Sequence, residues 1–147
     1  MFTARLIAPL LCLLAASALG QDYAGGSVYV SRAYIRSSSG FYLTAENGGG
    51  LPAPGAFSAD RRQPGPWETF RLVGGYGQHV YAIQTATGHF LTAEGGGPVG
   101  LASDRRAVGA WEKFTLEILS PGCAGEVAFR TAGGTYLTFE EIGRAHV

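Results

Sequence analysis

The sequence has few charges, and this scarcity excludes a class of partners. Charged residues make up 15% of the 147 residues, and the formal net charge is zero. Between residues 21 and 140, nine basic and ten acidic residues are spread without a run of like charge. Binding to nucleic acid or to an anionic membrane is therefore not expected, because both need clustered Lys and Arg.

Long hydrophobic runs are also scarce, and the one present lies at the N-terminus. Arg5 supplies a positive charge, residues 6–16 are apolar, and residues 16–20 offer small side chains for cleavage. This pattern predicts a secretory signal peptide over residues 1–20. The run is too short to span a bilayer, which needs about 20 apolar residues. We expect a secreted, extracellular protein with no membrane segment in its mature form.

Cysteine and histidine are too few to suggest a metal site. Cys12 falls in the predicted signal peptide, which leaves Cys123 as the only cysteine of the mature chain. In an oxidising compartment that thiol is either buried or paired with a cysteine beyond this sequence. His79 and His89 have no third ligand at metal spacing, so no metal is expected.

Helical periodicity and catalytic motifs are missing as well. Beyond the N-terminus, no window repeats apolar residues at helical spacing for three turns. There is no G-x-S-x-G, H-E-x-x-H, C-x-x-C or P-loop motif. Residues 95–100 match G-x-G-x-x-G, but a strand-like segment follows instead of the helix that holds a pyrophosphate. We expect a protein that is not an enzyme and needs no cofactor.

Glycine and aromatic residues, by contrast, are plentiful. The chain has 23 Gly, 7 Pro, 7 Tyr and 8 Phe, a composition typical of short strands joined by tight turns. Its length predicts one domain. The sequence therefore predicts a single all-β domain.

One short motif occurs three times. The segment G-F-Y-L-T-A-E at 40–46 recurs as G-H-F-L-T-A-E at 88–94 and as G-T-Y-L-T-F-E at 134–140. The first two copies are followed by D-R-R at 60–62 and 104–106, and by W-E-x-F at 67–70 and 111–114. Each complete unit predicts four short strands, with a glycine of positive φ in its first turn. After a linker at 21–27, the repeats cover about 28–76, 77–122 and 123–140.

Apolar residues that recur in the repeats alternate along the predicted strands and define the expected core. The fourth strand is expected to run through Trp67 to Val73 and through Trp111 to Ile118. For both tryptophans, the alternative is a platform that stacks on a sugar ring. The expected core residues are Leu43, Phe57, Trp67, Phe70, Leu91, Leu101, Trp111, Phe114 and Leu137.

Three copies of a four-strand unit indicate a closed, pseudo-threefold barrel, since a propeller needs about four or more blades. The combination of G-x-[YF]-L-T-A-E, a glycine run, D-R-R and G-x-W-E-x-F resembles the fascin-like β-trefoil domains of the actin-crosslinking superfamily. It is particularly similar to the secreted type found beside glycoside hydrolases. The resemblance covers about residues 28–140 and implies a β-trefoil. Ricin-type lectins share that fold, but their Q-x-W signature is absent.

The chain ends in E-I-G-R-A-H-V at 141–147, which back-translates with ordinary codons into the start of a common sequencing adapter. We leave this tail out of the domain and expect the third repeat to be truncated after Glu140, before its D-R-R turn and W-E-x-F strand. Each lost core residue costs about 2–5 kcal/mol against a total stability of about 5–15 kcal/mol. We predict that the polypeptide as written is unstable or prone to aggregate.

The candidate ligand contacts lie in turns and at strand ends. A carboxylate accepts hydrogen bonds from sugar hydroxyls, although for the glutamates we favour a structural role in tying the glycine loop or pairing with an arginine. Symmetry-related carboxylates also have equal environments, whereas a glycosidase needs one with a raised pKa. The candidates are Phe41, Glu46, Asn47, Arg62, His89, Glu94 and Arg106.

Three functions are compatible with these features. We favour a non-catalytic module that binds a polysaccharide or another glycan, with several weak sites acting together. Actin-filament binding or crosslinking, which the family resemblance suggests, conflicts with a signal peptide. The third alternative is a fragment of a longer secreted glycoside hydrolase that carries this module.

Overall fold

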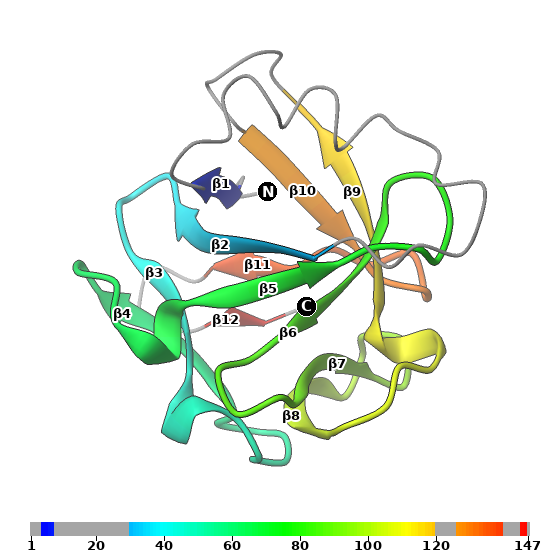
Figure 1. Ribbon diagram of the computed structural model, residues 1–147, viewed down its shortest axis with the longest axis horizontal. Coiled ribbons are helices and arrows are strands. Elements are labelled where there is room, and N and C mark those ends of the chain that lie inside the picture. Colours follow the sequence, from blue (N-terminus) through cyan, green and yellow to red (C-terminus); the bar gives the residue numbers. More distant parts are fainter. Residues whose placement is uncertain (1–3, 8–29, 120–125, 140–144, 147) are drawn as a thin grey trace.

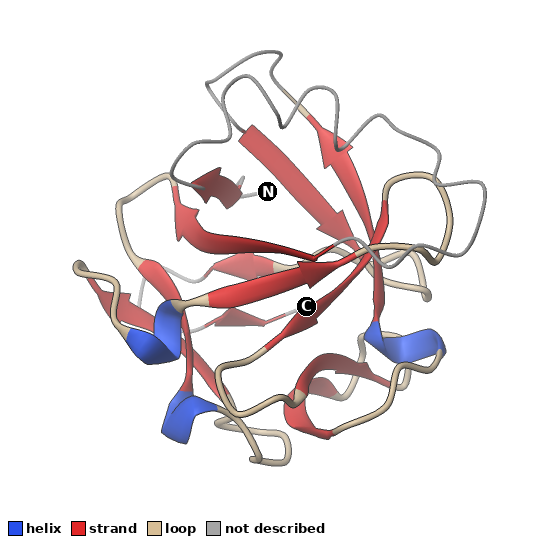
Figure 2. Ribbon diagram, viewed as in Figure 1, coloured by secondary structure: helices blue, strands red, loops and turns tan. Residues whose placement is uncertain are grey.

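The computed structural model describes residues 4–7, 30–119, 126–139 and 145–146 (Figure 1). In this part of the chain the protein is all-β, with strands joined by turns and three single turns of 3₁₀ helix (Figure 2). None of the described helices has the length and hydrophobicity that a membrane span requires. The 3₁₀ turns are η1 (Glu46–Gly48), η2 (Pro66–Glu68) and η3 (Ala110–Glu112). The strands are β1 (Ala4–Ile7), β2 (Val30–Ser37), β3 (Tyr42–Ala45), β4 (Phe57–Arg61), β5 (Phe70–Val73), β6 (Val80–Gln84), β7 (Phe90–Glu94), β8 (Gly100–Arg105), β9 (Lys113–Ile118), β10 (Glu126–Arg130), β11 (Thr138–Phe139) and β12 (Ala145–His146).

Six of these strands pair in a closed antiparallel ring. β2 pairs with β5, β5 with β6, β6 with β9 and β9 with β10. β1 then lies between β10 and β2 and completes the ring. Five of the six strands come from the repeats, and the sixth comes from the segment predicted as a signal peptide.

Three hairpins lie outside the ring, and their attachment repeats along the chain. β3 pairs with β4, β7 with β8, and β11 with β12. The preceding ring strand meets each hairpin through one equivalent residue pair: Arg36 with Tyr42, Gln84 with Phe90, and Arg130 with Tyr136. The predicted repeat is therefore also a repeat of strand pairing.

A glycine closes the equivalent turn in each repeat with a left-handed backbone. The φ angles of Gly40, Gly88 and Gly134 are 95°, 85° and 86°, a region that L-residues with a Cβ rarely enter. The prediction of positive φ at Gly40 and Gly88 is confirmed. The tail left out of the predicted domain contributes β12 to the third hairpin.

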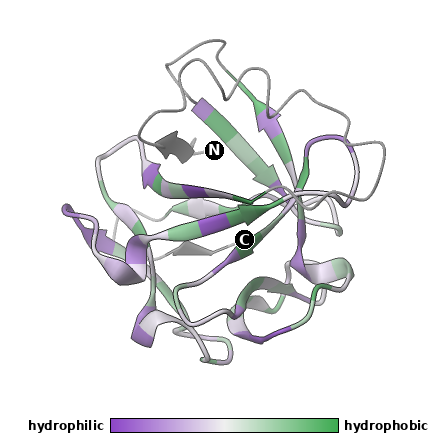
Figure 3. Cartoon of the chain, in the orientation of Figure 1, coloured by the Kyte–Doolittle hydropathy of each residue, from purple (hydrophilic) through white to green (hydrophobic). Residues whose placement is uncertain are grey.

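The core is built from equivalent residues of the three repeats. Ile35, Ile83 and Phe129 are fully buried on ring strands, and β5 has a single hydrophilic, exposed residue among hydrophobic, buried ones (Figure 3). Burying each large apolar side chain stabilises the fold by about 1.5–3 kcal/mol. The predicted core residues that are buried are Leu43, Phe57, Phe70, Leu91, Leu101, Phe114 and Leu137.

The prediction that Trp67 and Trp111 belong to the core is wrong. They are 40% and 42% exposed, and each lies on a 3₁₀ turn before the fourth strand instead of within it. The reason is the next residue: Glu68 and Glu112 are only 4% exposed. On so tight a turn, an inward glutamate leaves its neighbouring tryptophan at the surface.

The glycine loops of one repeat pack on the first turn of the next. The Thr87 hydroxyl donates to the Gly48 carbonyl oxygen at 2.7 Å, and the Thr131 hydroxyl donates to the Gly96 carbonyl oxygen at 2.8 Å. A Cβ on Gly97 would overlap the Thr135 side chain. The glycines therefore allow the backbone of one repeat to approach the first turn of the next repeat closely.

Candidate ligand-binding site

Two equivalent arginine–tryptophan clusters lie on the first two repeats. We define the first cluster as Glu46, Arg61, Trp67 and Glu68, and the second cluster as Glu94, Arg105, Trp111 and Glu112. The guanidinium carbon of Arg61 lies 5.7 Å from the Trp67 ring centroid, and that of Arg105 lies 5.9 Å from the Trp111 ring centroid. These distances are within the range of cation–π attraction.

The arginine of each cluster comes from the end of a hairpin strand. A register shift in the β3–β4 pair, between Tyr42 and Thr44, has its counterpart in the β7–β8 pair. Arg61 Nη1 donates to Glu46 Oε1 at 2.9 Å, and Nη2 donates to Oε2 at 3.3 Å. Two parallel hydrogen bonds of this kind fix both the position and the plane of a guanidinium group.

The second cluster repeats this pairing. Arg105 Nη2 donates to Glu94 Oε2 at 3.2 Å, and Nη1 donates to the other oxygen of that carboxylate. The favoured interpretation of Glu46 and Glu94, as carboxylates that pair with an arginine, agrees with this geometry. Their oxygens hold an arginine beside a tryptophan.

The buried glutamate of each cluster holds the tryptophan turn in place. Glu112 Oε1 accepts from the Thr92 hydroxyl at 3.0 Å, and Oε2 accepts from the Gly109 N–H at 2.8 Å. Glu68 accepts from Thr44 at 2.9 Å and from the Gly65 N–H at 2.8 Å. These bonds compensate the cost of removing a carboxylate from water.

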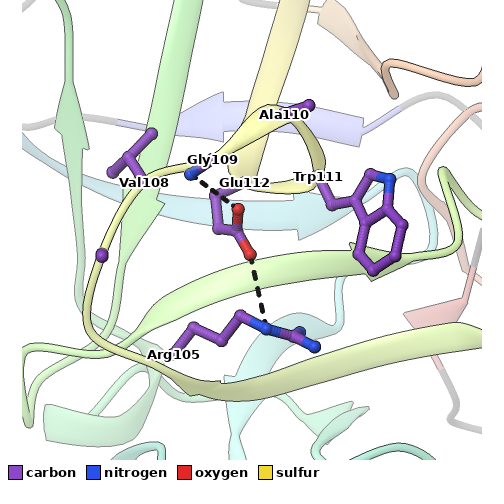
Figure 4. A pocket seen from close by; sticks show the side chains of 7 residues that line it. Arg105, Val108, Gly109, Ala110, Trp111 and Glu112 are labelled. Carbon is purple, nitrogen blue, oxygen red and sulfur yellow. Dashed lines mark hydrogen bonds and ion pairs between the residues drawn. The ribbon is translucent and has the colours of Figure 1, made fainter.

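A hollow of 390 Å³ adjoins the second cluster. Its wall combines an aromatic ring, a guanidinium group, a carboxylate and small aliphatic side chains, a mixture that suits a ligand with both polar and apolar faces. Figure 4 shows Glu112 between the Gly109 N–H and the Arg105 side chain, with the Trp111 ring beside them. The lining residues are Arg105, Ala107, Val108, Gly109, Ala110, Trp111 and Glu112.

The charges around each arginine are mostly negative. Arg61 has Glu46, Asp60 and Glu68 within 4 Å, at 2.9, 3.7 and 3.7 Å. A hydrogen bond from Arg61 lowers the pKa of the Glu46 carboxyl below its ordinary 4.5, and the same bond raises the pKa of Arg61. Glu46 is therefore ionised at neutral pH, which suits it to hold a cation and not to donate a proton.

Four other predicted contacts form a separate pair at the first turn in each of the first two repeats. The Arg62 guanidinium lies 4.2 Å from the Phe41 ring centroid. In the second repeat, His89 takes the place of Phe41, and Arg106 donates to the Thr87 carbonyl oxygen at 3.2 Å. Burial, followed by the charge of Arg106, lowers the pKa of His89 below its ordinary 6.5.

Asn47 joins neither group. It is exposed in η1 with a φ of 56°, a left-handed conformation that asparagine tolerates better than most residues. The seven predicted contacts are thus divided between the clusters, the turn pairs and this loop.

Sequence reasoning missed the partners that complete the clusters. The sequence places Arg61 and Arg105 in a solvated turn whose exposure makes its arginines the likeliest charged contacts to a partner, but it does not pair them with a tryptophan, and Glu68 and Glu112 were not singled out. A signal was present, because each glutamate follows a glycine by three residues, the spacing at which a carboxylate reaches back to a free N–H at a helix start. Cys123 lies outside the described residues.

No family model matches the chain, and no curated protein matches it with significance.

Proposed function

We propose that the chain is a secreted, non-catalytic module of the fascin-like β-trefoil type that binds polysaccharide. The closed ring of six strands, the three outer hairpins and the repeated attachment pairs support a trefoil. The motifs G-x-[YF]-L-T-A-E, D-R-R and G-x-W-E-x-F support the family. The N-terminal sequence pattern supports secretion.

One observation carries the choice of ligand. Trp67 and Trp111 are exposed at equivalent positions, and each is held by a fixed arginine. An exposed indole ring offers a flat apolar surface to the C–H face of a sugar, while nearby carboxylate and guanidinium groups accept from and donate to its hydroxyls. Two similar sites on one molecule favour a polymer with repeated sugar units.

The polar groups of the clusters argue for binding without catalysis. Glu46 is bound by Arg61 and by the Ser58 hydroxyl, and Glu112 by Thr92 and Gly109. Glycoside hydrolysis needs one carboxylic acid that keeps its proton near neutral pH. The lowered pKa of Glu46 is the opposite of that requirement.

The experiment is retention of the full chain on a panel of insoluble neutral and acidic polysaccharides. We expect retention on at least one of them, about tenfold weaker for Trp67→Ala or Trp111→Ala and lost for the double variant, because the two sites act together. Tyr76→Ala is the matched control, since Tyr76 is a 37% exposed aromatic residue outside both clusters. No retention on any polysaccharide, or equal loss in the control, would contradict the proposal.

A further inference from the structure

Three arginines lie on the outer face of β2 and β5, which run side by side in the ring (Figure 1). They are Arg32, Arg36 and Arg71, and we call them the arginine face. Side chains alternate along a strand, so Arg32 and Arg36 share the side of β2 opposite to the buried Ala33 and Ile35. Within the described part of the chain, no aspartate or glutamate forms an ion pair with any of the three.

The pairing of Arg32 with Arg71 carries a cost that the sheet does not offset. The two residues are directly opposite each other on β2 and β5, and like charges at that position destabilise a strand pair. On the other side of β5, Arg71 is opposite Gln84, which carries no charge. An anion bound between the two guanidinium groups would replace their repulsion with two attractions.

The second repeat shows that the ring does not need arginine at these positions. Its strand pair at the equivalent place has Val80 opposite Thr115. Gln84 attaches the second hairpin where Arg36 attaches the first. None of these second-repeat residues is charged, although the strands pair in the same way. The arginine face is therefore a property of the first repeat alone, and the fold does not explain it.

The arginine face is continuous with the first cluster. Arg36 is opposite Tyr42 of β3, and Tyr42 is in turn opposite Arg61 of β4. The guanidinium carbon of Arg36 lies 6.0 Å from the Tyr42 ring centroid. The rings of Tyr34 and Tyr42 meet edge to face, with their centroids 6.0 Å apart. A row of aromatic rings and guanidinium groups thus leads from the first cluster onto β2.

We propose that the arginine face binds the carboxylate groups of an acidic polysaccharide whose chain also contacts the first cluster. This inference rests on the proposed polysaccharide binding and names its class, a polymer of uronic acids. A guanidinium group donates two parallel hydrogen bonds to a carboxylate, which gives arginine its preference for that group. Residues 32 and 36 are about 13 Å apart along β2, so a ligand that meets both carries negative charge at more than one place along its length.

The first test compares retention of the full chain on insoluble polygalacturonic acid and on its methyl ester, which has the same backbone without the charges. We expect retention on the acid that weakens with added salt, and retention at least about tenfold weaker on the ester. Equal retention on both polymers would overturn this inference and leave polysaccharide binding in place. Retention on neither would also overturn it, whereas the proposed function fails only if no polysaccharide is retained. Stronger retention on immobilised dextran sulfate would contradict the choice of a carboxylate.

The second test uses Arg32→Gln combined with Arg71→Gln. Retention on polygalacturonic acid should weaken at least about tenfold, because two charge-assisted contacts are lost. The melting temperature should stay equal or rise, since two opposed like charges are removed. Arg130→Gln is the matched control, because Arg130 lies on β10 with its Nε 3.3 Å from Glu117 Oε1, and it should keep full retention. Unchanged retention in the double variant, or an equal loss in the control, would refute the arginine face as a binding surface.

Discussion

Each arginine–tryptophan cluster is organised by a buried glutamate. Glu112 bonds to the Thr92 hydroxyl and the Gly109 N–H, which fixes the turn that carries Trp111 at the surface. Arg105 lies nearby, with Nε 3.9 Å from Glu112 Oε1. The position of the aromatic platform therefore depends on a residue that is itself hidden from any ligand.

Replacing Glu112 with glutamine should destabilise the domain. The Gly109 N–H would then donate to a neutral amide oxygen instead of a carboxylate, and a hydrogen bond to a charged group contributes about 1.5–3 kcal/mol against about 0.5–1.5 kcal/mol for a neutral pair. Urea denaturation checks this expectation, with Glu117→Gln as the control on the more exposed part of β9. Equal free energies of unfolding for Glu112→Gln and the unaltered chain would contradict the structural role.

The surroundings of His89 predict that the stability of the domain depends on pH. Burial and the Arg106 charge lower its pKa from 6.5, with Asp104 acting weakly in the opposite direction. The folded state therefore binds a proton less readily than the unfolded chain, so the contribution to stability is complete above pH 6.5 and is lost as the pH falls towards the lowered pKa.

Thermal melts of the unaltered chain and His89→Gln between pH 7.5 and 5 measure this effect. The unaltered chain should lose more stability below pH 6.5 than the variant does. The Glu46–Arg61 pair is lost in a separate window, below pH 4.5, because its pKa is lowered from that value. Parallel curves for the two proteins would show that His89 does not titrate as described.

At the scale of elements, contacts between repeats depend on glycine loops that meet hydroxyl-bearing turns. The Gly96 carbonyl oxygen accepts from Thr131, and Gly97 packs against Thr135. The same arrangement joins the loop at Gly48 and Gly49 to Thr85 and Thr87. A side chain on either loop would separate consecutive repeats.

Gly97→Ala should therefore cost more stability than Gly55→Ala. Both glycines have positive φ, 133° and 94°, so alanine strains both backbones. Only at position 97 would the new Cβ overlap a neighbour, since Gly55 has open space around it. We expect a difference of about 1–3 kcal/mol in chemical denaturation. Equal losses of stability in the two variants would mean that close packing of the Gly97 loop against Thr135 is not required.

The elements also show how far sequence alone can go. The turns at Gly40, Gly88 and Gly134 and the buried Leu43, Leu91 and Leu137 could be predicted, because a repeated glycine or leucine has one simple physical reason. The exposed tryptophans could not, because apolar character alone does not say which of two adjacent residues on a tight turn points inward.

At the scale of the whole molecule, the ring shows a further limit of sequence reasoning. Spacing predicted the repeats and a closed barrel, and five ring strands follow from them. The sixth, Ala4–Ile7, shares no motif with the others, and backbone pairing between distant segments leaves no pattern in the side chains. The hollow near Trp111 could not be predicted from the sequence either, because its shape depends on how the turn that carries Trp111 folds around the side chain of Glu112.

The central claim is that the two arginine–tryptophan clusters are the ligand-binding sites, and the chain offers a direct measurement of it. Its only two tryptophans are Trp67 and Trp111, so intrinsic fluorescence reports on the clusters alone. On titration with a soluble form of a retained polysaccharide, we predict a saturable change in emission, partly reduced in Trp67→Phe and in Trp111→Phe. Binding detected by calorimetry with no change in tryptophan emission would contradict the account.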